Sequence, residues 1–470
     1  MIQLKTVLTL VATVALAACT TLGPNYQAPA ANAPTAYRAA APVAGAELQR
    51  DWWLMFNDAQ LNALEAQALQ ASPTLAAAAA RIERARAVFG ATKADHLPRV
   101  DLGANAGGLR TSAKATTTPV LNGHPVTFEG ETFGLQASIG WELDLWGRVK
   151  RQGESAQAQL DASTLDAAAA RVALTADVAN AYWQWRALAD ENAALQRLRD
   201  SRANAFKVAQ TRFDAGSSTT QDLERVRAEL AAADADVTDL PRRQALLLNQ
   251  IAALTGQAAA ELKLQASPMA APPLLRAGLP SELLQRRPDL AQSLAQLHAA
   301  TAQVGIAEAA FYPSIKLTGS FGYSSEDLGA LISAPARLYN VGPSISLPLF
   351  EGGRNKANLV ASKAQVDESL ATFRGRMLQA LREVDDALAE LQGRAATVDA
   401  QNRTLSSASQ ALTVARSRYD KGAVSYLDVT EAERTPLATE RALAQLRGAQ
   451  WAATAQLVKA LGGGWTPTGG

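Results

Sequence analysis

Arg212-Phe-Asp-Ala-Gly216 is followed, six residues after its glycine, by Asp222. The same pattern returns as Arg418-Tyr-Asp-Lys-Gly422, followed at the same spacing by Asp428. Glycine and aspartate both shift by 206 positions (422 minus 216 and 428 minus 222). Glycine can end a helix in the left-handed conformation, and helical patterns flank both segments, so each is predicted to be the tip of a helical hairpin.

A second pair of markers recurs earlier in each half. Pro73 and Pro98 return as Pro288 and Pro313, and both shift by 215 positions (288 minus 73 and 313 minus 98). Matches at several points along the two halves predict an internal duplication and a fold made of two similar repeats. No proline-, glycine- and serine-rich linker clearly separates them, and the closest candidate is 266–280.

Each predicted hairpin consists of one very long helix and a returning helix. No proline interrupts the helical pattern over 149–214 or over 353–420, and at a rise of about 1.5 Å per residue each stretch would reach about 100 Å. The tips are expected over 212–222 and 418–431. Apolar residues at heptad spacing predict that the long helices pack laterally on others. They are Leu174, Val178, Ala181, Trp185, Leu188 and Leu195 in the first copy, and Val366, Leu370, Phe373, Met377, Ala380, Val384, Ala387 and Leu391 in the second.

Four segments show the period-two alternation of β-strands. They are expected over 98–110, 132–146, 313–325 and 339–350. In the second, the odd positions from Phe133 to Leu145 are apolar, and such one-sided strands of about ten residues are typical of outer membranes. Four strands cannot close a membrane barrel, whose smallest forms have about eight, so several chains must contribute to one barrel. A soluble sandwich is the alternative.

Charge and composition exclude one class of partner. The 470 residues carry 45 basic and 44 acidic side chains, a formal net charge of +1, which gives no general attraction to nucleic acid. Hydrophobic residues make up 48% but aromatic residues only 6%, so much of the apolar content is alanine, which suits closely approaching helices. No later segment offers the roughly 18 uninterrupted apolar residues of a membrane helix.

The N-terminus has the features of an exported lipoprotein. A short apolar stretch from Val7 to Ala18 follows a basic residue, which predicts a signal peptide over 1–18. The single cysteine, Cys19, directly follows Leu16-Ala-Ala, a sequence that resembles the bacterial lipobox. We therefore expect a covalent lipid on Cys19 and, because Thr20 replaces the aspartate associated with inner-membrane retention, location in the outer membrane.

A series of short motifs accompanies these features. In chain order they are Gly23-Pro-Asn-Tyr26, Trp52-Trp53 with Phe56 and Asp58, Trp141-Glu-Leu-Asp-Leu-Trp-Gly-Arg148, Leu279-Pro-Ser-Glu-Leu-Leu-Gln-Arg-Arg-Pro-Asp289, Phe311-Tyr-Pro-Ser314, Leu347-Pro-Leu-Phe-Glu-Gly-Gly-Arg354 and Ala460-Leu-Gly-Gly-Gly-Trp465. Together they resemble the outer membrane factor lipoproteins of tripartite efflux systems, the NodT-type relatives of TolC and OprM. The resemblance covers essentially the whole mature chain.

The resemblance implies a mainly α-helical fold with a membrane β-barrel. Three chains of a homotrimer would each give four strands to one twelve-stranded barrel, continued by a long α-helical barrel in the periplasm. Efflux repeats would occupy 58–256 and 281–463. An N-terminal lipidated leader and equatorial segment would occupy 19–57, an inter-repeat equatorial segment 257–280 and a C-terminal tail 464–470. The implied function is a passive exit duct for small molecules, such as drugs, that an inner-membrane RND-type transporter delivers through a periplasmic adaptor protein.

The resemblance also implies a periplasmic aperture at the hairpin tips. Asp428 and Glu431 lie three residues apart and so share a helix face, and a trimer would set their carboxylates in rings around a narrow opening. Carboxylates held close together raise one another's pKa and attract cations, so this gate would favour cations. Asp222 is the counterpart in the first copy, where Arg225 replaces the second acid. The alternative is that these acids only complement the dipole of the first helical turn.

The tips are also candidate contacts for the adaptor, with plain helix capping as a compatible role. The residues concerned are Arg212, Phe213, Gly216, Arg418, Tyr419 and Gly422.

No enzyme, cofactor or metal site is expected. The histidines His96, His124 and His298 lack metal-ligand spacing, and no nucleophile or phosphate-binding motif occurs. Two other functions stay open. One is a protein-exporting duct of type I secretion with the same architecture, and the other is a structural coiled-coil lipoprotein of the cell surface.

Overall fold

The computed structural model describes residues 21–30, 33–39, 47–110, 112, 120–121, 124–125, 129–266 and 272–467. The expected signal peptide and the expected lipid site Cys19 lie outside these residues. The chain forms two compact units, and each takes segments from both halves of the sequence. Unit 1 comprises Met1–Pro29, Glu83–Ala162 and Ser293–Thr372, and unit 2 comprises Ala30–Ile82, Ser163–Gln292 and Phe373–Gly470.

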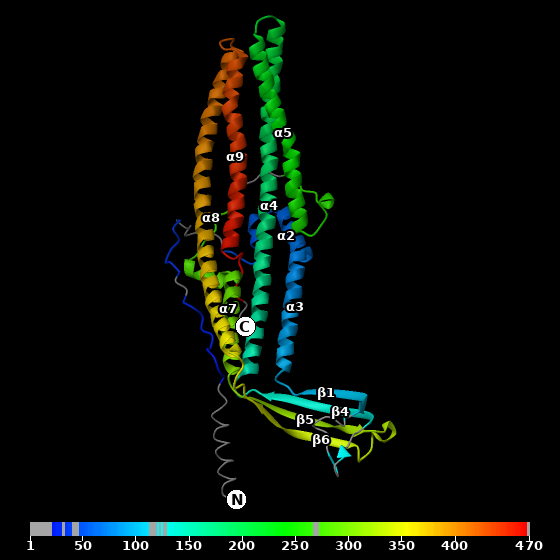
Figure 1. The fold of residues 1–470 in the computed structure, drawn as a ribbon. Helices are drawn as coiled ribbons and strands as arrows, with labels where there is room; N and C mark the ends of the chain where they lie inside the picture. Colours follow the sequence, from blue (N-terminus) through cyan, green and yellow to red (C-terminus); the bar gives the residue numbers. More distant parts are fainter. Residues whose placement is uncertain are drawn as a thin grey trace. The chain divides into compact units, whose positions relative to one another are not determined.

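The main helices come in pairs of equal length, which confirms the duplication (Figure 1). The members of each pair have 22, 67 and 35 residues in turn. The pairs are α3 (Pro73–Ala94) with α7 (Pro288–Ala309), α4 (Arg148–Asp214) with α8 (Arg354–Asp420), and α5 (Thr220–Leu254) with α9 (Tyr426–Ala460). The shorter elements are η1 (Trp52–Phe56), α2 (Ala59–Ala71), η2 (Ala259–Glu261), η3 (Pro280–Glu282), α6 (Leu283–Arg286) and η4 (Leu328–Ala330). None of the helices in the described ranges is long and apolar enough to cross a bilayer.

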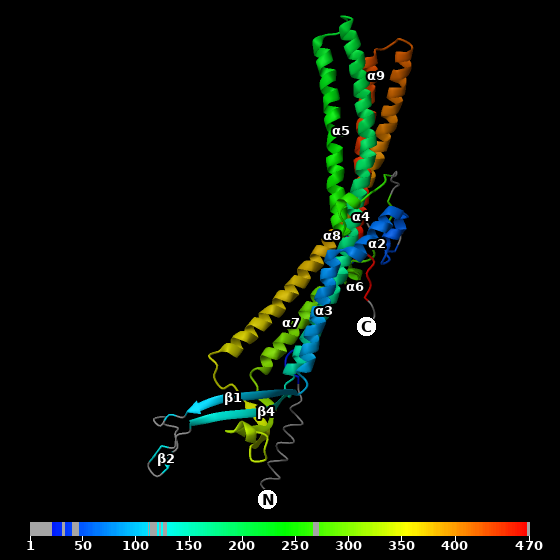
Figure 2. The same cartoon turned by 90° about the vertical axis from the view of Figure 1, so that its right-hand side faces the viewer.

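The heptad residues pack the helices of unit 2 together. All six that were predicted on α4 are buried. On α8 the predicted residues from Phe373 to Ala387 are buried, whereas Val366, Leu370 and Leu391 are half-buried. In unit 2 the returning helices run back along the long ones as two hairpins (Figure 2). The predicted lateral packing is therefore confirmed.

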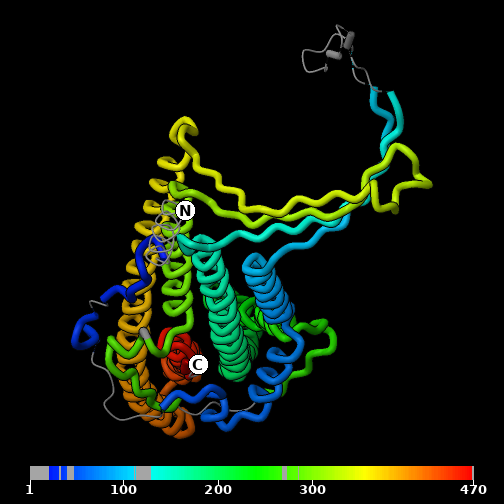
Figure 3. Tube along the Cα trace, turned by 90° about the horizontal axis from the view of Figure 1, so that it is seen from below, coloured from blue at the N-terminus to red at the C-terminus, as the bar shows by residue number. Residues whose placement is uncertain are grey.

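Unit 1 holds an antiparallel sheet of strand order β1-β4-β5-β6 (Figure 3). The strands are β1 (Arg99–Arg110), β4 (Glu129–Leu143), β5 (Ser314–Ser325) and β6 (Arg337–Ser346), and a separate pair joins β2 (Val120–Leu121) to β3 (His124–Pro125). Strands β4 and β5 come from different halves of the sequence and are neighbours in the sheet. The repeats therefore share one sheet, and β1 and β6 are its edges.

Strand β4 ends at Leu143, three residues before the expected end at 146. Asp144 leaves the ladder because its carboxylate accepts the backbone N–H groups of Val149 and Lys150 at 2.9 and 2.8 Å, which caps the start of α4. Strand β6 ends at Ser346 instead of 350, shortly before Pro348, which has no N–H group to donate to a ladder.

An aromatic cluster lies at the centre of unit 2. The rings of Trp183 and Trp451 stack with centroids 4.0 Å apart, and Phe56 meets both edge-on. Beside them, Asp58 caps α2 and accepts a hydrogen bond from the Tyr182 hydroxyl at 2.9 Å. Asp58 also pairs with Arg186, whose side chain is almost fully buried. The cluster fixes α2 against α4 and α9.

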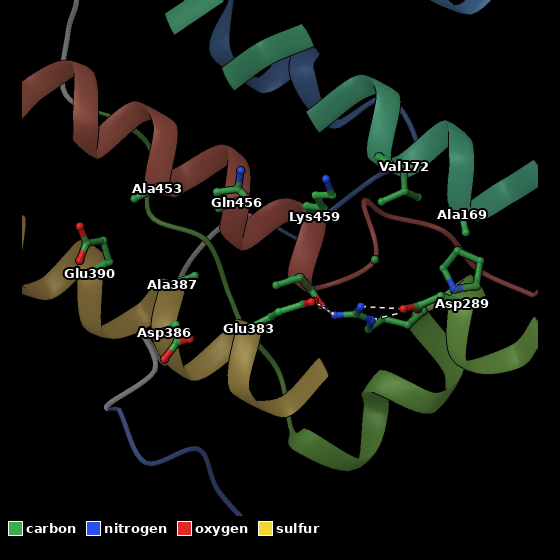
Figure 4. A pocket seen from close by; sticks show the side chains of 15 residues that line it. Ala169, Val172, Asp289, Glu383, Asp386, Ala387, Glu390, Ala453, Gln456 and Lys459 are labelled. Carbon is green, nitrogen blue, oxygen red and sulfur yellow. Dashed lines mark hydrogen bonds and ion pairs between the residues drawn. The ribbon is translucent and has the colours of Figure 1, made fainter. Parts of the chain in front are cut away.

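Two of the sequence motifs meet where α7 begins (Figure 4). The Arg287 guanidinium pairs with Asp289 at 2.7 Å and Glu383 at 2.6 Å, and it donates to the Ala460 carbonyl oxygen at 3.0 Å. Gly462 has a φ of +90°, and a Cβ there would lie 1.8 Å from the backbone oxygen of Arg286, so no other residue fits. A cavity of about 680 Å³ adjoins these residues.

Candidate functional site

Both hairpin tips end their long helix in the same way. Gly216 has a φ of +68° and Gly422 a φ of +73°. At the first tip, the N–H of Ser217 donates to the Arg212 carbonyl oxygen at 2.9 Å, and at the second, the N–H of Ala423 donates to the Arg418 carbonyl oxygen at 2.8 Å. These bonds close the helix ends in the six-to-one pattern of a glycine cap. The glycines are therefore needed at the tips for their left-handed conformation.

Both returning helices begin with a reciprocal capping box. Asp428 accepts the Ser425 N–H at 2.8 Å and the Ser425 hydroxyl at 2.7 Å, while the Asp428 N–H donates back to the Ser425 hydroxyl oxygen. Asp222 and Thr219 form the same arrangement. Within one chain, the two aspartates thus stabilise the first turn of a helix, which was the alternative role considered for them.

The capping bonds act on the charge of both aspartates. Hydrogen bonds from Ser425 lower the pKa of Asp428 below its ordinary value, and those from Thr219 do the same for Asp222. A hydrogen bond to the ionised form stabilises that form. Both exposed carboxylates are therefore held in the charged state. The mutual increase of pKa expected in a ring concerns carboxylates of neighbouring copies and stays a prediction.

Glu431 differs from Asp428 because it takes no part in the cap. Its side chain is exposed, and one of its oxygens lies 3.9 Å from the Arg434 guanidinium. It stands one turn beyond Asp428 on α9, as expected from the spacing.

At the first tip Arg225 lines a cavity of about 170 Å³ between the two hairpins. That cavity is also lined by Ala205, Val208, Ala209, Arg212, Ser217, Ser218, Asp222, Val226, Tyr426, Leu427 and Thr430.

The predicted adaptor-contact residues lie at the surface. Arg212, Gly216, Arg418 and Gly422 are exposed, and Phe213 is half-buried. Tyr419 is 41% exposed, and its ring meets that of Tyr426 with centroids 5.4 Å apart. Capping and surface exposure thus coincide at these positions.

Glu433 was not predicted from the sequence. It lies on α9, where it accepts a hydrogen bond from Ser201 on α4 and pairs with Arg416 on α8 at 2.6 Å. One carboxylate therefore connects both hairpins near the tips. The repeat gave no signal for it, because the residue 206 positions earlier is Arg227, which pairs with Glu224 on its own helix.

The sheet of unit 1 presents two chemically different faces. Residues paired directly across strands share a face. One row across the sheet is Val100, Ile139, Gly319 and Val341. The adjacent row, on the other face, is Asp101, Ser138, Ser320 and Asn340.

The apolar face extends over all four strands and is uncovered in the single chain. Leu102, Val341 and Tyr339 are 74%, 73% and 79% exposed. So broad an apolar surface marks contact with lipid or with another protein. In the described part of the chain, no cluster of three or more histidine, cysteine, aspartate or glutamate side chains could hold a metal ion.

Comparisons with known proteins agree with this geometry. The family model for outer membrane efflux proteins matches residues 64–257 and 279–463. Outer membrane protein OprJ of Pseudomonas aeruginosa is 34% identical over 458 residues, which cover 96% of this chain and 94% of OprJ. Cation efflux system protein CusC of Escherichia coli (strain K12) is 32% identical over 457 residues, covering 96% and 97%. The solved structure of the outer-membrane channel OprN has a TM-score of 0.85 and 31% identity, covering 95% of this chain and 100% of that one.

The two matched stretches correspond to the two structural repeats, one on each side of the inter-repeat segment. The paired helices, the shared four-stranded sheet and full-length similarity to outer membrane channels agree with one another. This chain belongs to the outer membrane efflux protein family.

Proposed function

We propose that the protein is the outer membrane channel of a tripartite efflux pump, a passive exit duct for small molecules. Three copies pool their strands into one closed sheet of twelve, and the hairpins form the periplasmic duct. An inner-membrane RND-type transporter supplies the energy, and a periplasmic adaptor connects it to the hairpin tips. The similarity over almost the whole chain to CusC, which is named as a cation efflux system protein, and the match to the outer membrane efflux protein family support this function.

The sheet is the observation that carries the proposal. Strands β1 and β6 are edges, and a sheet edge cannot stay unpaired in lipid because each bare backbone group costs several kcal/mol. The exposed apolar face requires hydrocarbon or protein against it. Pairing β1 of one copy with β6 of the next removes every edge while leaving the apolar face outside and the polar face towards the lumen.

The tips supply the selectivity of the duct. Asp428 and Glu431 of three copies form the cation-favouring aperture, and Asp222 contributes at the first tip. Glu431 is the cleaner test of the ring because it has no capping role. Asp428 combines a structural role, through its bonds to Ser425, with a charge that those bonds preserve.

Conductance of the purified protein in planar bilayers tests the proposal. Glu431→Gln should lower the ratio of cation to anion permeability, and Asp428→Ala with Glu431→Ala should lower it further. Ser425→Ala breaks the cap but keeps both charges, so it should cost about 1 kcal/mol of stability and leave selectivity unchanged. Asp239→Asn, an exposed acid away from the tip, is the control. Absence of pores in the wild type would contradict the channel, and unchanged selectivity in the double variant would contradict the ring.

A further inference from the structure

A buried arginine in unit 1 binds the segment Thr21–Tyr26, which we name the leader segment. The Arg151 Nε donates to the Leu22 carbonyl oxygen at 3.0 Å. Its Nη2 donates to the Gly23 carbonyl oxygen at 3.1 Å and to Asn25 Oδ1 at 2.9 Å. The Arg151 side chain is only 3% exposed. A charged group buried to this extent must be fully hydrogen-bonded, and here three of its partners belong to the leader segment.

The second repeat contributes the other wall of this site. Glu154, one turn after Arg151 on α4, accepts from Arg151 Nη1 at 2.7 Å and lies 2.9 Å from His298 Nε2 on α7. The His298 ring stacks on Tyr26, with centroids 4.5 Å apart and an interplanar angle of 19°. The leader segment is therefore held by α4 of the first repeat and α7 of the second.

The backbone of the leader segment fits closely into this site. Gly23 has a φ of +84°, and a Cβ on it would lie 2.3 Å from the Cα of Gly305 on α7. The Leu22 N–H donates to the Trp146 carbonyl oxygen at 3.1 Å. A Cβ on Gly147 would lie 2.7 Å from the Thr21 side chain. The segment is thus packed against α7 and against the turn between β4 and α4.

This position has a consequence for the sheet. Helix α4 directly follows β4, and α7 directly precedes β5, so the leader segment bridges the two helices at the seam where the strands of the two repeats pair.

We propose that Arg151, Glu154 and His298 form a binding site for the leader segment, and that the docked segment staples the two repeats together where β4 and β5 enter the sheet. The staple holds the sheet in the arrangement that inserts into the membrane. This inference depends on the proposed channel function, because the staple is proposed to act in membrane insertion.

Hydrogen exchange of the full-length protein, followed by mass spectrometry, tests the docking. Arg151→Met removes the guanidinium, while Gly23→Ala displaces the segment by a steric clash and leaves every side chain of α4 and α7 intact. Both should increase exchange of the leader segment about tenfold or more, the factor for one lost charge-assisted hydrogen bond. Arg81→Met, which removes an exposed arginine paired with Asp166, should leave the leader segment protected. Backbone amides around Leu240 in unit 2 should stay protected from exchange in all three variants.

Membrane insertion is measured in parallel as the yield of heat-modifiable protein in outer membranes. We expect the yield to fall several-fold in Arg151→Met and Gly23→Ala and to stay at the wild-type level in Arg81→Met. Unchanged leader exchange in both variants would overturn the docking site. Increased exchange of the leader segment together with a wild-type insertion yield would overturn the staple. Loss of folding in both Arg151→Met and Gly23→Ala would also overturn it, because the leader segment would then be part of the general core. Failure of the wild type to insert would instead count against the channel function.

Discussion

The two repeats approach each other closely in unit 2 at Gly448 on α9, and adding one methyl group there should separate the helices. A Cβ on Gly448 would lie 2.1 Å from the Cβ of Ala187 on α4, whereas ordinary contact begins at 3.4 Å. The helices would have to move apart by 1.3 Å (3.4 minus 2.1). Overpacking of a buried contact costs about 1–3 kcal/mol, while alanine in place of a helical glycine returns about 1 kcal/mol.

Gly375→Ala and Gly393→Ala on α8 are matched controls, because a Cβ at either position meets nothing within 4 Å. They should stabilise the protein by about 1 kcal/mol, so Gly448→Ala should be about 1–3 kcal/mol less stable than either. Denaturant unfolding in detergent, followed by tryptophan fluorescence, measures the difference, since Trp451 lies one turn from Gly448 and stacks on Trp183. Adding Ala187→Gly to Gly448→Ala should restore most of the loss. If Gly448→Ala is as stable as the controls, the helices do not pack as described.

The remaining predictions concern buried and capping carboxylates. Glu65 is fully buried and its oxygens have no hydrogen-bond partner among the described residues, so burial raises its pKa well above the ordinary value. A folded-state pKa above the unfolded one makes the free energy of unfolding fall by about 1.4 kcal/mol per pH unit between pH ~4.3 and the raised folded-state pKa. Glu65→Gln should therefore remove this pH dependence and stabilise the protein at pH 7, and an unchanged pH profile of unfolding would count against it. Asp58→Asn should lower the free energy of unfolding by about 3 kcal/mol, because it removes the carboxylate that pairs with the almost fully buried Arg186 side chain, and a denaturation midpoint equal to that of the wild type would refute the pairing. Because the bonds from Ser425 lower the pKa of Asp428, the selectivity that Asp428 contributes should be lost at a higher pH in Ser425→Ala than in the wild type, although the two agree at neutral pH; identical pH profiles of the two proteins in planar bilayers would disagree.

Much of the helical fold could be predicted because its signals are local or repeated. The left-handed caps at the tip glycines and the capping boxes at the following aspartates form between residues a few positions apart, so the local sequence is enough to predict them. Heptad spacing identified the buried face of α4 because that pattern follows from helix periodicity alone. Strand β4 was expected to end three residues too late because Leu145 continued the alternation, although Asp144 already caps α4.

The long-range polar contacts could not be predicted from one sequence. Arg151 meets the leader segment across 126 to 129 positions, and nothing in the local pattern indicates which backbone oxygens a buried arginine will bind. Glu433 connects three helices through a position at which the repeats differ. The repeat predicts shared geometry, whereas these contacts depend on where the two copies have diverged.

The central claim is that one face of the sheet lies against hydrocarbon and the other faces water. Nitroxide labels at Val341→Cys and Asn340→Cys test it in phospholipid vesicles, because these adjacent residues lie on opposite faces of β6. The label at 341 should collide mainly with oxygen dissolved in the lipid, and the label at 340 mainly with a water-soluble nickel complex. Equal access of both labels to the nickel complex would contradict the account.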